Sequence, residues 1–396
     1  MKSMAATNRV LLVTHEDCLL HNPGPAHVEG PERVKAVLEA LQGDAELASL
    51  TDRVEAREAS VDELALVHTP EYVRWVREQC ENGPRALDWD TPVAVESYRA
   101  ALLAAGSVLV AVDAVLSAAH GTDAAQGGAH GSGAEGRSAA GSTGPEKRDA
   151  GSDDARPGAA GAKSADKADP SATGSISPDT DGSKSASRSK IKSSARRAFC
   201  PARPPGHHAE KEKAMGFCLF NNIAVGARYA QKRGVDRVAI VDFDVHHGNG
   251  TESAFYGDGT VLFISFHQYP HYPGTGGSRD VGEGAGKGFN INIPLPSGSG
   301  DEEYKTAMES TVIPAIERFE PNLVMVSAGF DAHRDDPLSD LQVTEGGFGE
   351  ITRGIVAASG KSAMGRVVSV LEGGYNLESM AASALAHARM LAGLDE

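Results

Sequence analysis

The segment Asp242–Gly250 carries two carboxylates and two adjacent imidazoles within a few residues. It follows an apolar, β-branched run, Val238–Val241, which is typical of a buried strand. Alternate side chains of a strand point to the same face, so we expect Asp242, Asp244 and His246 to project together. Clustered carboxylates are costly unless a cation lies between them. The segment therefore predicts a metal site at the end of a strand.

A third candidate ligand, Asp331, follows the apolar run Leu323–Ala328. Together with Asp244 and His246 it offers two oxygens and one nitrogen. Three protein ligands with one open position are typical of catalytic zinc, whereas structural zinc is closed by four ligands, often cysteines. Carboxylate ligation is also compatible with Fe2+, Mn2+ or Co2+. Asp331 by itself could be a helix N-cap or a turn residue, but a metal cluster elsewhere in the chain favours a ligand.

Two further motifs could supply acid–base and oxyanion chemistry. His207 and His208 lie in a Pro-rich loop, and imidazole titrates near neutral pH, so the pair could exchange protons beside a metal-bound water. Asp242 need not be a ligand, because it could accept a hydrogen bond from one imidazole and fix its tautomer. Tyr375 follows two glycines and could donate a hydrogen bond to a developing oxyanion. The alternatives are two solvated loop histidines and a tyrosine on a surface turn.

Helices and apolar strands alternate along the second half of the chain, which predicts a parallel sheet covered on both faces. In such sheets ligands bind beyond the carboxyl ends of the strands, where the polar motifs and His267 also lie. We expect strands at 10–14, 238–243, 261–266, 288–294, 323–328 and 367–371. We expect helices at 32–41, 70–79 with a start at 61–64 before it, 95–119, 223–233, 301–319, 346–359 and 380–391.

Composition limits the classes of partner. The chain has 396 residues, a net charge of −16 and 40% apolar residues. Such acidity argues against nucleic acid as a partner and is compatible with cationic substrates. The four cysteines form no CxxC pair, and neither a signal peptide nor a membrane span is expected, so we expect a cytoplasmic protein. The oligomeric state is not predicted.

One segment, 120–198, is rich in Gly, Ala, Ser, Asp and Lys and contains almost no large apolar residue. It cannot bury enough surface to offset the loss of chain entropy, so we expect a disordered insert. Residues 1–119 and 199–396 would then form one domain together. The basic residues near the end of the insert could be a weak docking patch or only part of a solvated tail.

These motifs together resemble the zinc-dependent histone deacetylase family, in its class II-like branch. The resemblance rests on Arg203–His208, Gly216–Cys218, Asp242–Gly250, Ser327–Pro337 and Glu372–Tyr375, which occur in the family's order. It implies the arginase/deacetylase α/β fold, with an eight-stranded parallel sheet and helices on both faces, and makes residues 1–119 and 199–396 one deacetylase domain.

The resemblance also implies a role for individual residues. Zinc would be held by Asp244, His246 and Asp331, with His208 as the general base and acid beside His207, and Tyr375 would polarise the acetyl carbonyl. The substrate-binding residues would be Gly216, Phe217, Tyr272 and Leu338, with Asp90 holding a peptide backbone at the rim. A potassium ion would be bound through Asp242, Asp244, His246, Ser265 and Phe266, partly by backbone carbonyls.

Two positions depart from other branches of the family. Asn249 stands where some branches have an aspartate behind the second histidine, so His208 should be less basic. Class II-like members share this asparagine. Leu338 occupies the position of the glutamate gatekeeper in the polyamine-selective branch, which argues against acetylated polyamines.

The leading hypothesis is a deacetylase that acts on acetyl-lysine in proteins or peptides. A small-molecule amidohydrolase acting on acetylated polyamines or other acetylated amines is the alternative. A non-catalytic acyl-lysine binder is disfavoured by the complete set of motifs. A binuclear Mn2+ hydrolase related to arginase would need further Asp and His ligands that the sequence does not obviously supply.

Overall fold

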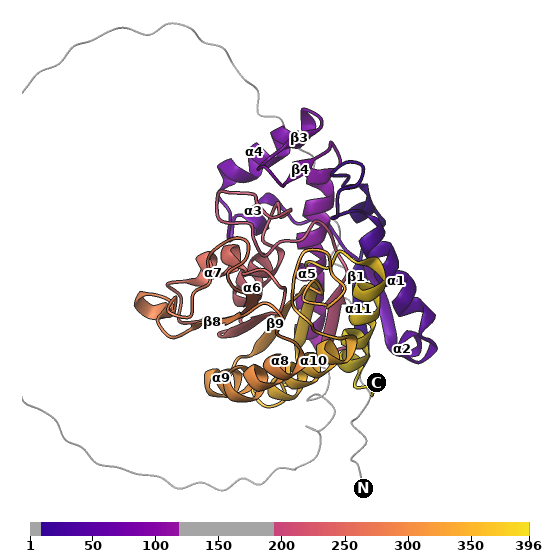
Figure 1. The fold of residues 1–396 in the computed structure, drawn as a ribbon. Coiled ribbons are helices and arrows are strands. Elements are labelled where there is room, and N and C mark those ends of the chain that lie inside the picture. Colours follow the sequence, from indigo (N-terminus) through magenta and orange to yellow (C-terminus); the bar gives the residue numbers. More distant parts are fainter. Residues whose placement is uncertain (1–8, 119–193, 396) are drawn as a thin grey trace, which may run out of the picture. The chain divides into compact units, whose positions relative to one another are not determined.

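Eight parallel strands form the central sheet, in the order β2-β1-β5-β10-β9-β6-β7-β8 (Figure 1). The computed structural model describes residues 9–118 and 194–395, which belong to one compact unit. The expected parallel sheet with helices on both faces is confirmed. Its strands are β1 Val10–Thr14, β2 Thr51–Glu55, β5 Arg197–Cys200, β6 Val238–Asp242, β7 Val261–Gln268, β8 Asn290–Leu295, β9 Leu323–Ala328 and β10 Val367–Leu371.

Each face of the sheet has its own hydrophobic core, because successive strand residues point to opposite faces. In β1, Leu11 and Val13 enter one core, whereas Val10 and Leu12 enter the other. The first core is covered by α3 Val61–Leu64, α4 Pro70–Glu81, α5 Ser97–Ala118, α6 Asn222–Lys232 and α7 Asn249–Phe255. The second is covered by α1 Glu32–Gly43, α2 Ala45–Leu50, α8 Asp301–Ala307, α9 Ile313–Phe319, α10 Glu345–Ala358 and α11 Leu377–Ala392.

Helix α5 lies in the first core and packs on β1, β5 and β10. By length and composition it could cross a membrane, but 78% of its most apolar window is buried inside the protein. Gly106 allows its close packing, since a Cβ there would lie 1.6 Å from the carbonyl oxygen of Arg57. The burial is that of a core helix.

Three expectations need correction. The boundary of the insert at residue 198 is too late, because Arg197 and Ala198 pair in β5 between β1 and β10. Residues 120–193 of the expected insert lie outside the described residues. The helix at 301–319 is interrupted by a π-helical turn, Met308–Val312, just before Pro314. His267 lies inside β7 and does not follow it.

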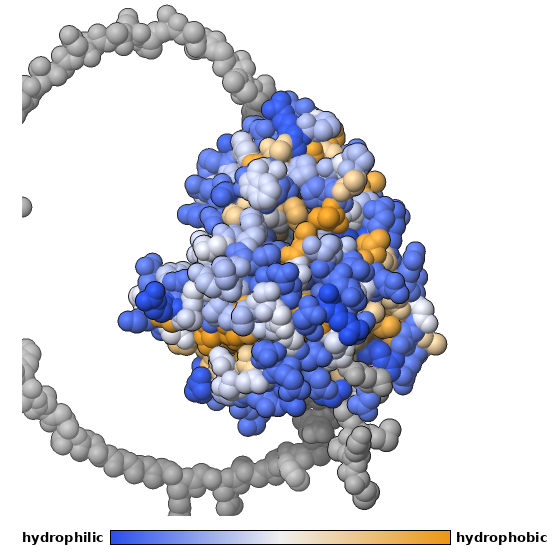
Figure 2. All heavy atoms as spheres, in the orientation of Figure 1, coloured by the Kyte–Doolittle hydropathy of each residue, from blue (hydrophilic) through white to orange (hydrophobic). Residues whose placement is uncertain are grey.

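Short elements complete the architecture: the 3-10 helices Glu16–Leu20 and Gly284–Gly286, and a small hairpin of β3 Arg85–Ala86 and β4 Pro92–Val93. Figure 2 shows a largely hydrophilic described surface on one face, with apolar residues gathered below the β3–β4 hairpin.

A buried ion cluster ties the N-terminal segment to two loops at the carboxyl edge of the sheet. Glu29 accepts hydrogen bonds from Arg203 Nη2 at 2.6 Å and from Arg33 Nη1 at 3.1 Å. Arg33 Nε donates to the Gly374 carbonyl at 2.6 Å, and Arg203 Nη1 donates to the His21 carbonyl. The three charged side chains are essentially inaccessible. Burial opposes ionisation of Glu29, but the arginines outweigh it and lower the pKa of this carboxyl.

We expect Glu29→Gln to lower the free energy of unfolding by about 3–5 kcal/mol, because it leaves two buried guanidinium groups without their shared anion. Denaturant unfolding followed by circular dichroism measures this change. Glu81→Gln, which removes the partner of Arg77 in an exposed pair, should cost less than about 0.5 kcal/mol. Equal losses in the two variants would contradict the structural role of the buried cluster.

Candidate active site

Three buried side chains that could hold a metal ion converge beyond the ends of β6 and β9: Asp244, His246 and Asp331. Their candidate ligand atoms all lie within 4.8 Å of one another. His246 Nδ1 lies 3.0 Å from Asp244 Oδ1 and 3.2 Å from Asp331 Oδ2. Asp331 Oδ2 is buried, and apart from this approach of His246 Nδ1 it accepts no hydrogen bond from the described residues. Two carboxylates and one imidazole, with one carboxylate oxygen unsatisfied, form a donor set that fits a divalent cation.

The loop after β6, and not the pleat of the strand, brings these groups together. The strand ends at Asp242, so the expectation that Asp242, Asp244 and His246 share one strand face is wrong. The backbone N–H of Asp244 donates to Asp242 Oδ1 at 3.1 Å, and that of His246 donates to Asp244 Oδ1 at 2.9 Å. Each carboxylate therefore orients the residue two positions further along the chain.

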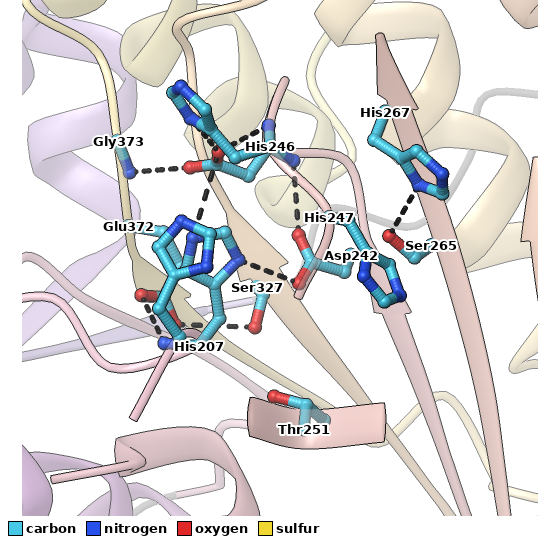
Figure 3. A network of polar contacts seen from close by, with 12 residues as sticks. His207, Asp242, His246, His247, Thr251, Ser265, His267, Ser327, Glu372 and Gly373 are labelled. Carbon is cyan, nitrogen blue, oxygen red and sulfur yellow. Dashed lines mark hydrogen bonds and ion pairs between the residues drawn. The ribbon is translucent and has the colours of Figure 1, made fainter. Parts of the chain in front are cut away.

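Two glycines let the backbone approach the carboxylates. A Cβ at Gly329 would lie 2.0 Å from Asp244 Oδ2, and one at Gly373 would lie 2.0 Å from Asp331 Oδ2. The N–H of Gly373 donates to Asp244 Oδ2 at 2.8 Å (Figure 3). Any side chain at these positions would displace a candidate ligand.

Burial and charge together shift the pKa values of the cluster. Burial raises the pKa of Asp242 to about 6, and burial followed by repulsion from Asp244 raises the pKa of Asp331. Burial disfavours a charged His246, but Asp244 and Asp331 outweigh it and raise its pKa to about 10. Burial also opposes ionisation of Asp244, but His207 and His246 hold its pKa well below the usual range. All four pKa shifts indicate that positive charge between the buried carboxylates is stabilising.

The adjacent histidines have different partners, and Figure 3 shows His207 turned towards Asp242. His207 Nδ1 lies 3.0 Å from Asp242 Oδ2, and His208 Nδ1 lies 2.7 Å from Asn249 Oδ1. Asn249 Nδ2 donates to Glu210 Oε1 at 2.8 Å, which turns its carbonyl oxygen towards His208. His208 therefore carries its proton on Nδ1, and its Nε2 is the nitrogen that can accept another.

The pKa values of the two histidines are shifted in opposite directions. Burial opposes protonation of His207, but Asp244 and Asp242 outweigh it and raise its pKa well above the ordinary value. Burial and the neighbouring His207 lower the pKa of His208 well below that value. Glu372 fixes the backbone of the loop that carries the two histidines. The N–H groups of Gly206 and His207 donate to its Oε2 at 2.7 and 3.1 Å.

Tyr375 is held by groups that lie far from it in the sequence. Its N–H donates to Asp336 Oδ2 at 2.7 Å, and the Arg33 guanidinium lies 4.9 Å from the centre of its ring. Gly374, at φ +118°, provides the turn before it. Burial raises the pKa of Tyr375 well above its ordinary value, so the phenol is a hydrogen-bond donor.

A cavity of about 500 Å³ connects this chemistry to solvent. His208, His246 and Tyr375 line it. Ring contacts continue along its walls, with Tyr272 5.2 Å from His208 and Phe217 5.8 Å from Tyr375. All of the residues predicted to bind substrate line the same cavity: Asp90, Gly216, Phe217, Tyr272 and Leu338.

Of the residues suggested for potassium, Asp244 and His246 belong to the candidate metal cluster, and Ser265 and Phe266 lie on β7 next to Asp242. Ser265 pairs with Asp242 across β6 and β7 and hydrogen bonds to His267 Nδ1 at 3.1 Å. The ring of Phe266 stacks on Tyr304 at 4.8 Å in the second core, so only its backbone could face an ion.

Several residues that build the site were not anticipated from the sequence. Arg33, Asp336 and Glu372 hold its loops, His271 stacks on His246 at 5.1 Å, and Trp89 lines the cavity. Glu372 could have been suspected because it precedes the glycine pair. Nothing local distinguishes the others, since their partners lie in distant segments.

Comparisons with known proteins agree with this geometry. The family model described as the histone deacetylase domain matches residues 27–141 and 158–391. A probable deacetylase of Archaeoglobus fulgidus is 33% identical over 370 residues, covering 93% of this chain and 81% of the relative. A histone deacetylase-like amidohydrolase of Pseudomonas aeruginosa is 32% identical over 395 residues, covering 93% of this chain and 82% of the relative.

A solved structure described as the HDA15 HD domain matches with a TM-score of 0.74 and 32% identity, covering 98% of this chain and 89% of that one. Sequence, fold and family model thus agree over most of the chain. The chain belongs to the histone deacetylase family.

Proposed function

We propose that this hydrolase of the histone deacetylase family is a zinc-dependent enzyme that removes the acetyl group from acetyl-lysine in proteins or peptides and releases acetate. The proposal rests on one observation: one cavity is lined by His246 of the candidate metal cluster, by His208 of the histidine pair and by Tyr375. Amide hydrolysis requires an electrophile for the carbonyl, a base for water and an acid for the leaving amine. This arrangement offers a group for each.

Zinc held by Asp244, His246 and Asp331 would supply a Lewis acid that polarises the acetyl carbonyl and makes water more acidic. The phenol of Tyr375 donates a hydrogen bond to the oxyanion that develops on that carbonyl. Its backbone is anchored by Asp336, so the donor is oriented before substrate binds.

His208 moves the proton. Its neutral form is favoured, and the hydrogen bond to Asn249 leaves Nε2 free to accept the proton of the attacking water. The same nitrogen then delivers a proton to the leaving lysine amine, so the products are a free amine and acetate. Asp244 and Asp242 raise the pKa of His207, which favours a positive charge beside the developing oxyanion.

The cavity suits an extended acyl-lysine. The rings of Phe217 and Tyr272 line walls that an aliphatic lysine chain could contact, with Gly216 and Leu338 beside them. Asp90 Oδ1 already accepts the Gly216 N–H at 3.1 Å, and this carboxylate could also accept a peptide N–H.

The proposed enzyme would also accept other divalent metals, bind potassium and lie in the cytoplasm. Fe2+ or Co2+ could replace zinc at the same donors. A potassium ion at Asp242, Asp244, His246, Ser265 and Phe266 would offset part of the buried negative charge. We also propose a cytoplasmic location, which is supported by four free, buried cysteines.

The alternative substrate class is a small acetylated amine or polyamine. A cationic amine would suit the carboxylate of Asp90 at the cavity, whereas the apolar Leu338 offers such an amine no partner. A panel of acetyl-lysine peptides, longer acyl-lysines, acetylated polyamines and other acetylated amines compares the two classes. Higher kcat/KM for the small amines would overturn the leading assignment.

Replacing Tyr375 by Phe should lower kcat for acetate release from an acetyl-lysine peptide by about 100- to 1,000-fold, because one oxyanion donor is lost. Acetate production by the zinc-loaded enzyme is the measurement. Tyr256→Phe, at the end of α7, is the matched control and should keep its rate. A Tyr375→Phe enzyme with normal kcat would exclude the oxyanion role.

His208→Ala should lower kcat by about 100- to 10,000-fold, since the proton carrier is removed. The same acetate assay applies, with zinc content measured in parallel to show that the metal is retained. His15→Ala, at the start of a 3-10 helix, serves as the control. Full turnover by His208→Ala would mean that another group moves the proton.

Elemental analysis of purified, zinc-reconstituted protein should find one zinc per chain. Replacing a residue that hydrogen bonds to a metal ligand typically weakens metal binding by about 10- to 100-fold. Asp331→Asn should weaken zinc binding by more than that, because Asp331 is a proposed ligand itself. Asp335→Asn changes a 60%-exposed neighbour and should bind zinc normally. Two equivalents of Mn2+ in the active protein would contradict a mononuclear site.

A further inference from the structure

Trp89 is far more exposed than any other large apolar side chain of the described residues, at 80% against 54% for Val95. It lies at a tight turn between β3 and β4, where its N–H donates to Asp88 Oδ1 at 2.7 Å and the Thr91 N–H donates to the Asp88 carbonyl at 3.2 Å. The indole also lines the active-site cavity together with the exposed Val28. The turn therefore holds a large aromatic surface open to solvent at the entrance to the site.

A continuous aromatic wall joins this indole to the catalytic end of the cavity. The ring of Tyr272 lies 5.2 Å from His208 and 6.3 Å from Trp89. The Tyr272 hydroxyl is buried and interacts with the Asp90 carboxylate, but it makes no hydrogen bond of good geometry among the described residues. A buried hydroxyl without a good hydrogen bond is costly, so a polar ligand group at this position would satisfy it.

The charges around Trp89 are mainly negative. Asp88 and Asp90 flank it in the sequence, and both are partly buried. Lys213 Nζ forms an ion pair with Asp88 Oδ2 at 3.8 Å, and the Lys213 side chain is 55% exposed. The chain as a whole carries −16.

We propose that Trp89, the Tyr272 hydroxyl and the flanking carboxylates form a cation subsite at the entrance to the cavity, which binds an ammonium or guanidinium group that the substrate carries in addition to its acetylated amine. An indole face attracts cations, a phenol oxygen can accept a hydrogen bond from them, and carboxylates pair with them. The inference rests on the proposed function, because it specifies which acetylated substrates are preferred.

Two sources could provide this cation: a basic residue next to acetyl-lysine in a peptide, or the free amine of a singly acetylated diamine. The first test uses peptides that are identical except at one neighbour of acetyl-lysine, which is Arg, citrulline or Leu. Citrulline matches the shape of arginine without its charge. The second test compares a monoacetylated diamine with the acetylated monoamine of the same chain length.

For the wild-type enzyme we expect kcat/KM to be about two- to five-fold higher with Arg than with citrulline, which is the effect of one exposed cation–π contact. The ratio should fall to about one in Trp89→Ala, fall partly in Tyr272→Phe and persist in part in Trp89→Phe. A higher ratio in the diamine pair than in the peptide pair would identify the small amine as the source.

Equal rates with Arg and citrulline, together with equal rates in the diamine pair, would overturn the proposal. An unchanged ratio in Trp89→Ala would also overturn it. If Leu were favoured as much as Arg, the indole would provide only an apolar contact, and the cation subsite would be wrong.

Fluorescence provides a measurement that does not depend on turnover. The chain has two tryptophans, and the other one, Trp75, stacks on Tyr72 in α4. In Trp75→Phe, emission reports on Trp89 alone. Peptides in which a methyl ketone replaces the acetyl amide bind without being hydrolysed. The Arg peptide should change this emission and protect it from acrylamide at lower concentration than the citrulline peptide.

The two measurements separate the possible failures. If acetyl-lysine peptides are hydrolysed without preference for a cation, the subsite is wrong and the proposed function stands. If no acetylated substrate is hydrolysed, but Trp89 emission still prefers the Arg peptide, the proposed function is wrong and the subsite stands. Identical emission changes with the Arg and citrulline peptides would refute the subsite in either case.

Discussion

The structure depends on several carboxylates that are buried close to one another. Asp242, Asp244, Asp331 and Glu372 are fully buried at one edge of the sheet. Carboxylates removed from water repel one another and demand protons, cations or hydrogen-bond donors. The surrounding architecture supplies such partners: imidazoles, backbone N–H groups and glycines that let the chain come close. A divalent cation among these ligands would meet the same demand, and for that reason a metal centre and a proton-transfer site can occupy one place.

The sheet topology makes this concentration of polar groups feasible. β5, β10, β9 and β6 are adjacent in the middle of the sheet and run in the same direction. The loops that follow them therefore meet at one edge, although they come from segments far apart in the chain. Two hydrophobic cores hold the strands rigidly beneath these loops. The apolar layers provide the stiffness, and the loops provide the chemistry.

Different neighbours give two adjacent histidines different tasks. The carboxylates of Asp244 and Asp242 raise the pKa of His207, whereas burial and the neighbouring His207 lower the pKa of His208. One ring keeps its charge, and the other can accept a proton and give it back. Behind them, the buried Glu29 anchors Arg33, which holds the backbone before Tyr375. The scaffold and the reactive groups are thus linked through ionic contacts, and packing alone does not position the site.

Local patterns in the sequence suffice to assign most helices and strands, the acidic and imidazole motifs, and their common location at strand ends. Those patterns depend on near neighbours: apolar periodicity, the residues that follow each strand, and runs of small polar residues. They failed where contacts are distant. β5 was hidden at the end of a polar segment because its short run of residues is stabilised by β1 and β10 on either side.

The same limit applied to the site. Asp244, His246 and Asp331 could be named as candidate ligands, but an alternating strand was the wrong reason, since the loop after β6 turns their side chains together. Arg33 and Asp336 could not be found at all, because their roles arise from partners hundreds or tens of residues away. Residue type and order determine which chemistry the chain can carry. Only the folded chain decides which groups meet, because burial and non-local hydrogen bonds set their orientation and charge.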